Sequence, residues 1–483
     1  MKWSMFFSGV AALSILVGTA WAADEAAKPA SPERAFSALD FGAVADGKTD
    51  DTAAIQKAID AASKQGGIVY LPAGKYLVAG SLNIKVGVAL KGVQEAPVSI
   101  DPLTGTVILA TGGRDKEDAP ALFEMGQSST VKGLTVWYPD QKPTDIHPYP
   151  WTFHLRDFDN TVEDITLINS YNGIRVGPEN NVRHRIRSVY GCVLRRGLEV
   201  DNCTDIGRVE NVQFHCHWWS AKSTGGAWKP VYQYMIDHLD AFVFARTDWE
   251  YVTNCFVFPA NIGWRFIKSE HGMCNGQFTG DGADATQTAV QVDAIQYMGL
   301  LITGGQFVSF NGKDPVEVRV SDTNRGNVRF VNCAFWGPSN NNAIIKGKGY
   351  VSFSDCFFSS SKKDTPDNPL VVAKSGRLQI NNSSFASKKP SVELGPDVTH
   401  AIIQGNNGAN GVKVIDKTGG KAIVKDNEPA GKRGGGDSGF DGAVSPGQGR
   451  HRDIKAAKAP TVWRFGGRNS RHAGRKGVSP IGL

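Results

Sequence analysis

A short pattern recurs through the middle of the chain and limits what it can fold into. Each copy places Asn, Asp or Gly after a β-branched run, and an apolar residue follows three positions later. The copies are Asn211-Val-Gln-Phe214, Asn254-Cys-Phe-Val257, Asn275-Gly-Gln-Phe278, Gly304-Gly-Gln-Phe307, Asn332-Cys-Ala-Phe335, Asp355-Cys-Phe-Phe358 and Asn382-Ser-Ser-Phe385. Their spacings are 43, 21, 29, 28, 23 and 27 residues, and such periods indicate stacked repeats, the first interval being close to two of them.

The segments between the copies read as strands. They are short, rich in Val, Ile and Phe, and broken by Gly and Asn, as in GNVRFVNCAFWG and GYVSFSDCFFSS. A repeat of this length holds three short strands and three turns, so stacking predicts an all-β fold, a right-handed parallel β-helix. Asn at one turn of successive coils is expected to stack its side-chain amides. A β-sandwich, the main alternative, would not place Asn at one offset in seven segments.

The segment from residue 40 to 76 predicts a helix that covers the open end of this solenoid. Asp50 is a good N-cap, and Ile55, Ala58, Ile59 and Ala62 form one apolar stripe. Gly66 and Gly67 end the helix, and a strand follows. Exposed strand edges invite aggregation, so a cap is required. We therefore expect the acidic residues of this segment to cap and turn the chain rather than to catalyse.

The same segment, DFGAVADGKTDDTAAIQKAIDAASKQGGIVYLPAGKY, closely resembles the N-terminal motif of pectate-lyase-like β-helix proteins. This group includes rhamnogalacturonase-like and epimerase-like domains and relatives of family-28 glycoside hydrolases. Together with the repeats, the resemblance covers residues 36–425. It implies a polysaccharide partner, which members of the group hydrolyse, cleave by β-elimination, epimerise or only bind. The polygalacturonase signatures N-T-D, D-D, G-H-G and R-I-K are not found in order, so the residue roles of that branch are not carried over.

The two ends of the chain predict export and a separate tail. An apolar run precedes Ala20-Trp21-Ala22, which is typical of a signal peptide over residues 1–22; a membrane anchor is the alternative. A linker (23–35), the β-helix (36–425) and a disordered basic tail (426–483) follow. Residues 431–483 carry 11 Lys and Arg against 3 Asp and Glu, or +8, so the rest of this +6 chain is −2. The mature protein is expected to be secreted or periplasmic, without nucleic acid or membrane partners.

Cysteine usage predicts neither disulfides nor a zinc site. The seven cysteines are odd in number and include no C-x-x-C pair. Cys255, Cys333 and Cys356 each follow Asn or Asp inside an apolar stretch, as small buried residues do. No metal or other cofactor is predicted.

Aromatic and basic residues concentrate between residues 137 and 265, where we expect the sugar-binding surface. Aromatic planes match the apolar faces of sugar rings, and long loops on rigid scaffolds commonly carry function. The 43-residue interval is read as such a loop, although its aromatics can instead pack the loop onto the coil. The candidate binding residues are Tyr149, Trp151, Arg183, His184, His215, His217, Trp218, Trp219 and Trp249.

The first functional expectation is a glycoside hydrolase, which needs two carboxyl groups at a defined separation. Asp248 and Glu250 lie two apart at the start of a strand, so both side chains are expected to face one groove. Asp281 and Asp284 on the next turn, and then Asp237, complete the catalytic candidates. Each of these acids can also serve as a turn or cap residue.

Two alternatives remain open. A lyase or epimerase on a uronate polymer needs cations for the substrate carboxylate and a group that takes the C5 proton. The basic strip of Arg183, His184, Arg185, Arg195 and Arg196, with His215 and His217, offers these groups. The second alternative is a β-helix that binds glycans without catalysis. The sequence does not specify the sugar, the linkage or the oligomeric state.

Overall fold

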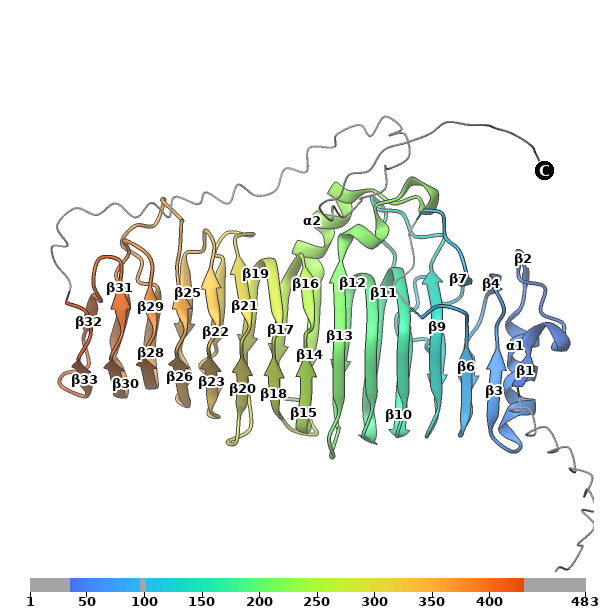
Figure 1. The fold of residues 1–483 in the computed structure, drawn as a ribbon, viewed down its shortest axis with the longest axis horizontal. Helices are drawn as coiled ribbons and strands as arrows, with labels where there is room; N and C mark the ends of the chain where they lie inside the picture. Colours follow the sequence, from blue (N-terminus) through green and yellow to red (C-terminus); the bar gives the residue numbers. More distant parts are fainter. Residues whose placement is uncertain (1–34, 96–100, 430–483) are drawn as a thin grey trace, which may run out of the picture. The chain divides into compact units, whose positions relative to one another are not determined.

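The computed structural model describes residues 35–95 and 101–429. The paired strands of this part all run parallel and wind into successive coils with three faces, as Figure 1 shows. Long strands such as β11 and β12 bend around the corners and belong to more than one face. The expected parallel β-helix is confirmed.

The first face, face A, stacks one strand from every coil. Its strands are β1 (Ala35–Ser37), β3 (Gly67–Tyr70), β6 (Val88–Lys91), β9 (Thr130–Trp137), β11 (Thr161–Val182), β12 (Arg185–Val200), β13 (Arg208–His215), β15 (Thr247–Thr253), β18 (Cys274–Thr279), β20 (Leu300–Thr303), β23 (Val328–Val331), β26 (Tyr350–Ser354), β28 (Val371–Asn381), β30 (Val392–Gln404) and β33 (Ala422–Lys425).

Face B follows face A in each coil and continues through the second halves of β9 and β11 to β13. Its other strands are β2 (Asp46–Asp50), β4 (Gly74–Val78), β7 (Thr106–Ala110), β16 (Phe256–Phe258), β19 (Gly282–Val292), β21 (Gln306–Ser309), β24 (Ala334–Trp336), β27 (Phe357–Phe358), β29 (Ser384–Phe385) and β31 (Asn407–Gly408).

Face C closes each coil and shares β11, β12, β19, β28 and β30 with the other faces. Its own strands are β5 (Leu82–Ile84), β8 (Phe123–Met125), β10 (Trp151–Phe158), β14 (Asp240–Phe244), β17 (Ala260–Phe266), β22 (Val316–Val320), β25 (Asn341–Ile345) and β32 (Val414–Asp416). Apolar side chains from all three faces fill the interior, so the core runs along the whole stack.

The recurring Asn marks a left-handed turn between faces A and B. Residues at this corner have φ between 52° and 73°, which Asn, Asp and Gly tolerate better than other residues. The corner residues are Gly133, Asp164, Ser188, Asn211, Asn254, Gly280, Gly304, Asn332, Asp355, Asn382 and Gly405. Two expectations were wrong: Gly280 holds the place assigned to Asn275, and the 43-residue interval is one coil, because β13 pairs directly with β16.

A second ladder lies one residue after this corner and points inward. There Asp281, Ser383 and Asn406 each accept the backbone N–H of the previous coil, at 2.8, 3.1 and 2.9 Å. Asn406 donates a 2.9 Å hydrogen bond to the Asn427 side chain on this ladder, whereas no side-chain hydrogen bond joins two turn residues in the described part of the chain. Cysteines occupy other rungs, and all seven are buried and free, as predicted.

Helix α1 (Thr52–Ser63) confirms the predicted N-terminal helix and its buried stripe of Ile55, Ala58, Ile59 and Ala62. It follows the short helix η1 (Ala38–Phe41) and contacts β1, β3, β5 and β6. The acidic residues before it hold backbone N–H groups: Asp50 accepts from Thr52, and Asp51, which is the N-cap in place of Asp50, accepts from Val44 and Ala45. That α1 closes the end of the solenoid stays a prediction.

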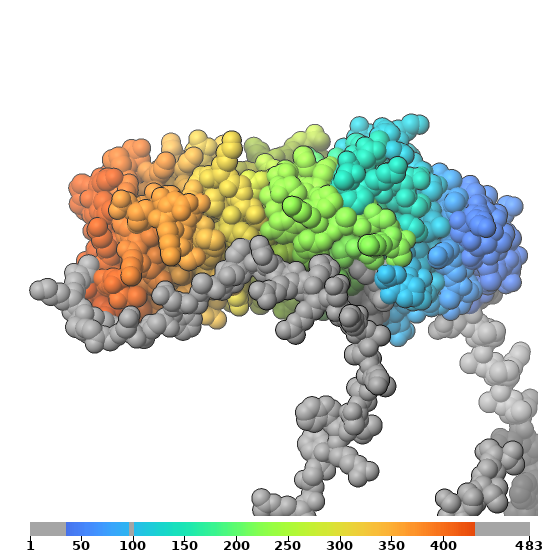
Figure 2. All heavy atoms as spheres, turned by 90° about the horizontal axis from the view of Figure 1, so that it is seen from above, coloured from blue at the N-terminus to red at the C-terminus, as the bar shows by residue number. Residues whose placement is uncertain are grey.

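One insertion leaves the coil between β13 and β14. It contains helices η2 (Cys216–Trp219), η3 (Lys222–Thr224) and α2 (Trp228–His238). In Figure 2 its green atoms lie on the viewed face between the N-terminal and C-terminal coils. Among the described helices, none has the length and apolar character needed to cross a membrane. The predicted signal peptide, the linker up to residue 34 and the tail from residue 430 lie outside the described residues.

Candidate functional site

The insertion and the outer side of face B form an aromatic patch made of Tyr190, His215, His217, Trp218, Trp228 and Phe258. His215 stacks on Phe258 with ring centroids 4.7 Å apart, and Trp228 lies 5.5 Å from His215. Trp218 lies 6.2 Å from Tyr190 and 6.3 Å from His217. Trp228 is 41% exposed, so the patch offers an aromatic plane to solvent. The structure therefore brings together the predicted His215, His217 and Trp218.

A second group of side chains meets at the corner between faces B and C, at the other end of α2. We call it the arginine–tyrosine cluster: Tyr171, Arg195, Arg196, Tyr234, His238, Asp240 and Arg265. The Tyr171 and Tyr234 side chains influence each other electrostatically, and the His238 ring lies 4.3 Å from the Tyr234 ring. Helix α2 carries Trp228 at its start and Tyr234 and His238 near its end, so it connects the patch and the cluster.

Cations and carboxylates alternate across this cluster. Arg265 bonds Asp240 at 2.9 Å and Asp293 at 3.2 Å. Arg196 lies 3.5 Å from Glu199 and 3.9 Å from Asp240. The Arg196 Nη1 atom is buried and has no hydrogen-bond partner among the described residues. Arg196 thus shares its charge with two carboxylates, whereas Arg195 makes no ion pair among the described residues and is the guanidinium left for an anion.

The two tyrosines of the cluster are held as neutral phenols. Burial raises the pKa of Tyr171 and of Tyr234, and Glu117 raises both further. The positive charge of Arg195 opposes this and lowers both pKa values. Asn172 holds Glu117 through a 3.0 Å hydrogen bond. Both phenols are therefore protonated at neutral pH, and each can donate its O–H in a hydrogen bond.

The expected carboxylate pair does not form. Trp249 has φ +55°, which breaks the alternation of β15, so Glu250 points into the core while Asp248 stays at the surface. Although burial raises the pKa of Asp248, hydrogen bonds from Arg246 and Gln296 outweigh it and hold the pKa below its usual value. Both residues belong to the corner between faces C and A, whereas the insertion leaves at the corner between faces B and C. The prediction of one shared groove was wrong.

The other predicted acids occupy three different settings. Asp281 is an inward ladder residue, 2% exposed, and burial raises its pKa to about 7. Asp237 is exposed on α2 and accepts a 3.0 Å hydrogen bond from Gln233. Asp284 follows Ala283, which pairs with Val257, and it interacts electrostatically with Tyr232. Of the predicted acids, Asp284 is therefore the one beside the aromatic patch.

Several predicted binding residues do not face the patch. Trp219 and Tyr149 are fully buried; Trp219 donates to Thr224 O at 3.2 Å, and Tyr149 packs on Tyr138. Trp249 is 63% exposed, and Arg183 binds Asp159 at 2.8 and 3.0 Å; both belong to the corner between faces C and A. Trp151 begins β10 on face C and is half-buried. The basic strip is divided, because β12 carries Arg185 and Arg195 on different faces.

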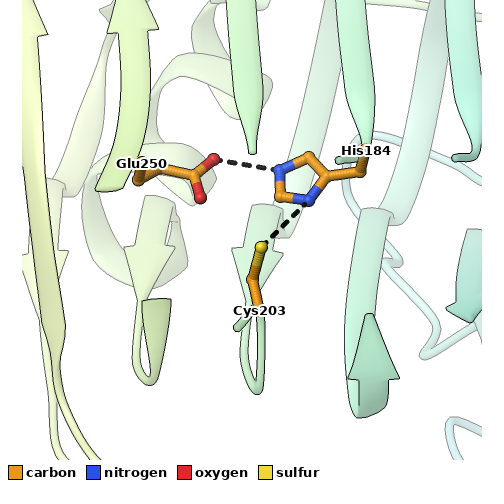
Figure 3. Close-up of side chains that lie close together, drawn as sticks. All are labelled: His184, Cys203 and Glu250. Atoms are coloured by element: carbon orange, nitrogen blue, oxygen red, sulfur yellow. Dashed lines mark hydrogen bonds and ion pairs between the residues drawn. The ribbon is translucent and has the colours of Figure 1, made fainter. Parts of the chain in front are cut away.

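His184 points inward and joins a buried group with Cys203 and Glu250, drawn in Figure 3. Its Nε2 atom lies 2.9 Å from Glu250 Oε1, and its Nδ1 atom lies 3.7 Å from Cys203 Sγ. Although burial lowers the pKa of His184, the charges of Glu250 and Cys203 outweigh it and raise the pKa to about 10. All three side chains are at most 1% exposed, so this group cannot contact a polysaccharide.

Sequence reasoning missed part of the arginine–tyrosine cluster. Tyr171 and Arg265 lie in different coils, and nothing in the local pattern links them to Tyr234. The available signal was the Arg195-Arg196 pair ahead of Gly197, because two adjacent cations in an apolar strand require anionic partners. The resulting surface can hold an anion with its arginines, stack a ring on Trp228 and move a proton through Tyr234 or His238.

Comparison with known proteins finds similarity to a family of β-helix proteins and to enzymes that act on polysaccharides. The family described as rhamnogalacturonase A/epimerase, pectate lyase-like, matches residues 35–113. Mannuronan C5-epimerase AlgE3 of Azotobacter vinelandii is 46% identical over 85 residues, 16% of this chain and 5% of that protein. Alginate lyase 7 of the same organism is 65% identical over 46 residues, 9% of this chain and 5% of that protein.

A solved structure extends the likeness to most of the described coils. The A-module of the A. vinelandii mannuronan C5-epimerase AlgE4 aligns over 80% of this chain and 99% of that module, with a TM-score of 0.52 and 17% identity. At this identity the likeness concerns the fold. This chain spans only 5% of the length of the two sequence relatives named above. The N-terminal segment thus matches a pectate-lyase-like family, and the described coils share the β-helix fold of that epimerase module.

Proposed function

We propose that this protein is an exported enzyme that acts on a polyuronate by removing the proton from C5 of a uronate residue. This is the first step of both β-elimination and C5 epimerisation. The observation that carries the proposal is the meeting of β11, β12 and α2, where Tyr171, Arg195 and Tyr234 interact beside His238. The names of the relatives, C5-epimerases and an alginate lyase, support it. They do not support the hydrolase expectation.

Each group in the cluster has a chemical task. A C5 proton becomes acidic when the neighbouring carboxylate is neutralised, because the charge of the resulting enolate is then shared with the cations. Arg195 supplies that positive charge. His238 is exposed and has a ring nitrogen that can take the proton. Tyr234, which is neutral, donates a proton to the opposite face of C5 in epimerisation, or to the leaving O4 in elimination.

The test compares variants on alginate and polygalacturonate. Tyr234→Phe removes the hydroxyl and keeps the ring, and it should lower kcat by about 10²-fold, the usual effect of losing a general acid. Tyr297→Phe is the matched control, because Tyr297 is 74% exposed and lies in another turn. Ultraviolet absorbance from an unsaturated uronide identifies elimination, and a change of C5 configuration without absorbance identifies epimerisation. Full activity in Tyr234→Phe would contradict the assigned role.

Export is part of the same proposal and is tested separately. The apolar N-terminal run and Ala20-Trp21-Ala22 support it. Protein recovered from the periplasm or the culture fluid should begin at residue 23. Recovery of a chain that retains residues 1–22 in the cytoplasm would contradict export without affecting the assigned reaction.

A further inference from the structure

The buried group of His184, Cys203 and Glu250 contains an orphaned oxygen. Glu250 Oε1 meets His184, whereas Glu250 Oε2 is buried and has no hydrogen-bond partner among the described residues. Figure 3 shows this second oxygen on the side of Cys203, without a dashed line. Leaving a buried carboxylate oxygen unpaired is costly, so this atom requires a partner.

The architecture of the corner between faces C and A makes room for that partner. Arg185, Arg208 and Tyr251 are paired with one another across three successive coils. The residues directly before them are His184, Gly207 and Glu250. Gly207 therefore stands between the other two on one inward ladder. A Cβ at Gly207 would lie 2.1 Å from His184 Cε1 and 2.4 Å from Glu250 Oε2. Only glycine leaves this space for the imidazole and the carboxylate.

Cys203 enters the same space from a neighbouring ladder. Isolated bridges pair Asn181 with Cys203 and Cys203 with Thr247, and Thr247 pairs with Cys274. One ligand atom from each of His184, Cys203 and Glu250 lies within 4.8 Å of the other two. Ligand atoms around a tetrahedral zinc ion are about 3.3–3.8 Å apart, given bond lengths of about 2.0–2.3 Å. If the separations between these ligand atoms shorten by about 1 Å, the three side chains occupy three of the four ligand positions of such a site.

We propose that His184, Cys203 and Glu250 form a structural binding site for a borderline divalent transition-metal ion of the zinc type, inside the solenoid. Thiolate, imidazole and carboxylate together suit Zn²⁺ or Co²⁺ and not Ca²⁺ or Mg²⁺, which take all-oxygen shells. The ion displaces the thiol proton and the proton shared between His184 and Glu250, and it gives Glu250 Oε2 its partner. Cys274, which follows Thr247 on the ladder of Cys203, is the candidate fourth ligand.

The site has no path to substrate, so its role is to join coils. His184, Cys203 and Glu250 come from three successive passes around the solenoid, and an ion would tie these passes together. A buried metal of this kind is acquired while the coils form, because ligand binding and folding are coupled. This inference does not depend on the proposed enzymatic reaction.

The test is metal analysis of the full chain after dialysis against a chelator. The native protein, produced in zinc-supplemented medium, should retain roughly one zinc ion per chain. Cys203→Ser and Glu250→Gln should lose it. Cys356→Ser is the matched control, because it also removes a buried thiol but stands on a ladder where the next coil already carries Ser383. Cobalt-grown native protein and control should show thiolate-to-cobalt absorption, and Cys203→Ser should not.

Two results would overturn the proposal. The first is native protein without stoichiometric transition metal, a measurement that needs no variant to fold. The second is equal metal content in the native protein, Cys203→Ser and Cys356→Ser, which would place any bound metal elsewhere.

Discussion

At the scale of single residues, the inward ladder makes a prediction about Asp281. Burial raises its folded-state pKa from the ordinary 3.8 to about 7 and outweighs the hydrogen bond from Cys255, and its second oxygen has no partner among the described residues. Between these pH values the folded state binds more protons than the unfolded state. The free energy of unfolding should therefore fall as pH rises from about 4 to about 7.

Asp281→Asn removes this loss, since Asn stays neutral and already occupies the ladder at Asn406 and Asn427. At pH 8 the variant should be more stable than the native protein by an amount on the order of 3 kcal/mol, and the gap should shrink toward pH 4. Urea unfolding at the two pH values measures the gap. A gap that does not change with pH would contradict the buried, protonated carboxyl.

Residue-level reasoning failed where a local backbone conformation overrode the strand period. Alternation along β15 places Asp248 and Glu250 on one face, but the left-handed Trp249 between them separates the two side chains. Tryptophan gives no hint of a left-handed corner, whereas Asn and Gly do. The inward direction of His184 was hidden for a related reason, because Arg183 beside it is also left-handed.

At the scale of elements, the turn between faces A and B tests why Asn recurs. Asn332 has φ +52°, so Asn332→Val forces a β-branched residue into the left-handed region and should cost about 1–2 kcal/mol of stability. Asn332→Gly should be nearly neutral, because Gly280 and Gly304 fill the same place in other coils. Thermal unfolding of both variants decides the matter. Equal destabilisation by Gly and Val would mean that the Asn side chain itself is required.

The insertion tests the aromatic patch as a sugar-stacking surface. Trp228 begins α2 and packs beside His215, so Trp228→Ala removes exposed aromatic area without opening the core. We expect KM for a polyuronate to rise several-fold while kcat changes little, since uniform binding is lost. Tyr297→Phe serves again as control. A large fall in kcat with unchanged KM would instead place Trp228 among the reacting groups.

The sequence predicted where the insertion lies but did not predict the helices inside the insertion. The long interval between Asn211 and Asn254 marked where the chain leaves the coil. Helix α2 was not expected, although Val231 and Met235 lie at helical spacing and are buried. The tryptophans of the insertion differ in exposure: Trp219 is buried, Trp218 is half-buried and Trp228 is exposed. Their exposure depends on how the insertion packs onto the coils, which the local sequence pattern does not reveal.

At the scale of the whole molecule, the fold could be predicted because every coil buries its apolar side chains in the same way. A corner residue that tolerates φ near 55°, followed by inward residues, recurs from coil to coil. The candidate site has no such redundancy. Tyr171, Arg195, Tyr234 and Arg265 come from separate elements and meet only once the coils are stacked and α2 is in place.

The proposed chemistry is likewise a property of the assembled surface. The coils supply arginines at the corner between faces B and C, and the insertion adds the tyrosine, histidine and tryptophan. The coils and the insertion each contribute one of the two tyrosines, so the cluster is complete only when both are in place. Removal of the C5 proton is therefore the central claim that connects the fold to a function.

Incubation of alginate and polygalacturonate with the native protein in D₂O, followed by NMR of the C5 position, tests this claim most directly. The account predicts that deuterium enters at C5, or that the C5 proton is lost with formation of an unsaturated uronide, and that Tyr234→Phe suppresses either change. New reducing ends with the C5 proton intact would contradict removal of the C5 proton and would instead indicate a glycoside hydrolase.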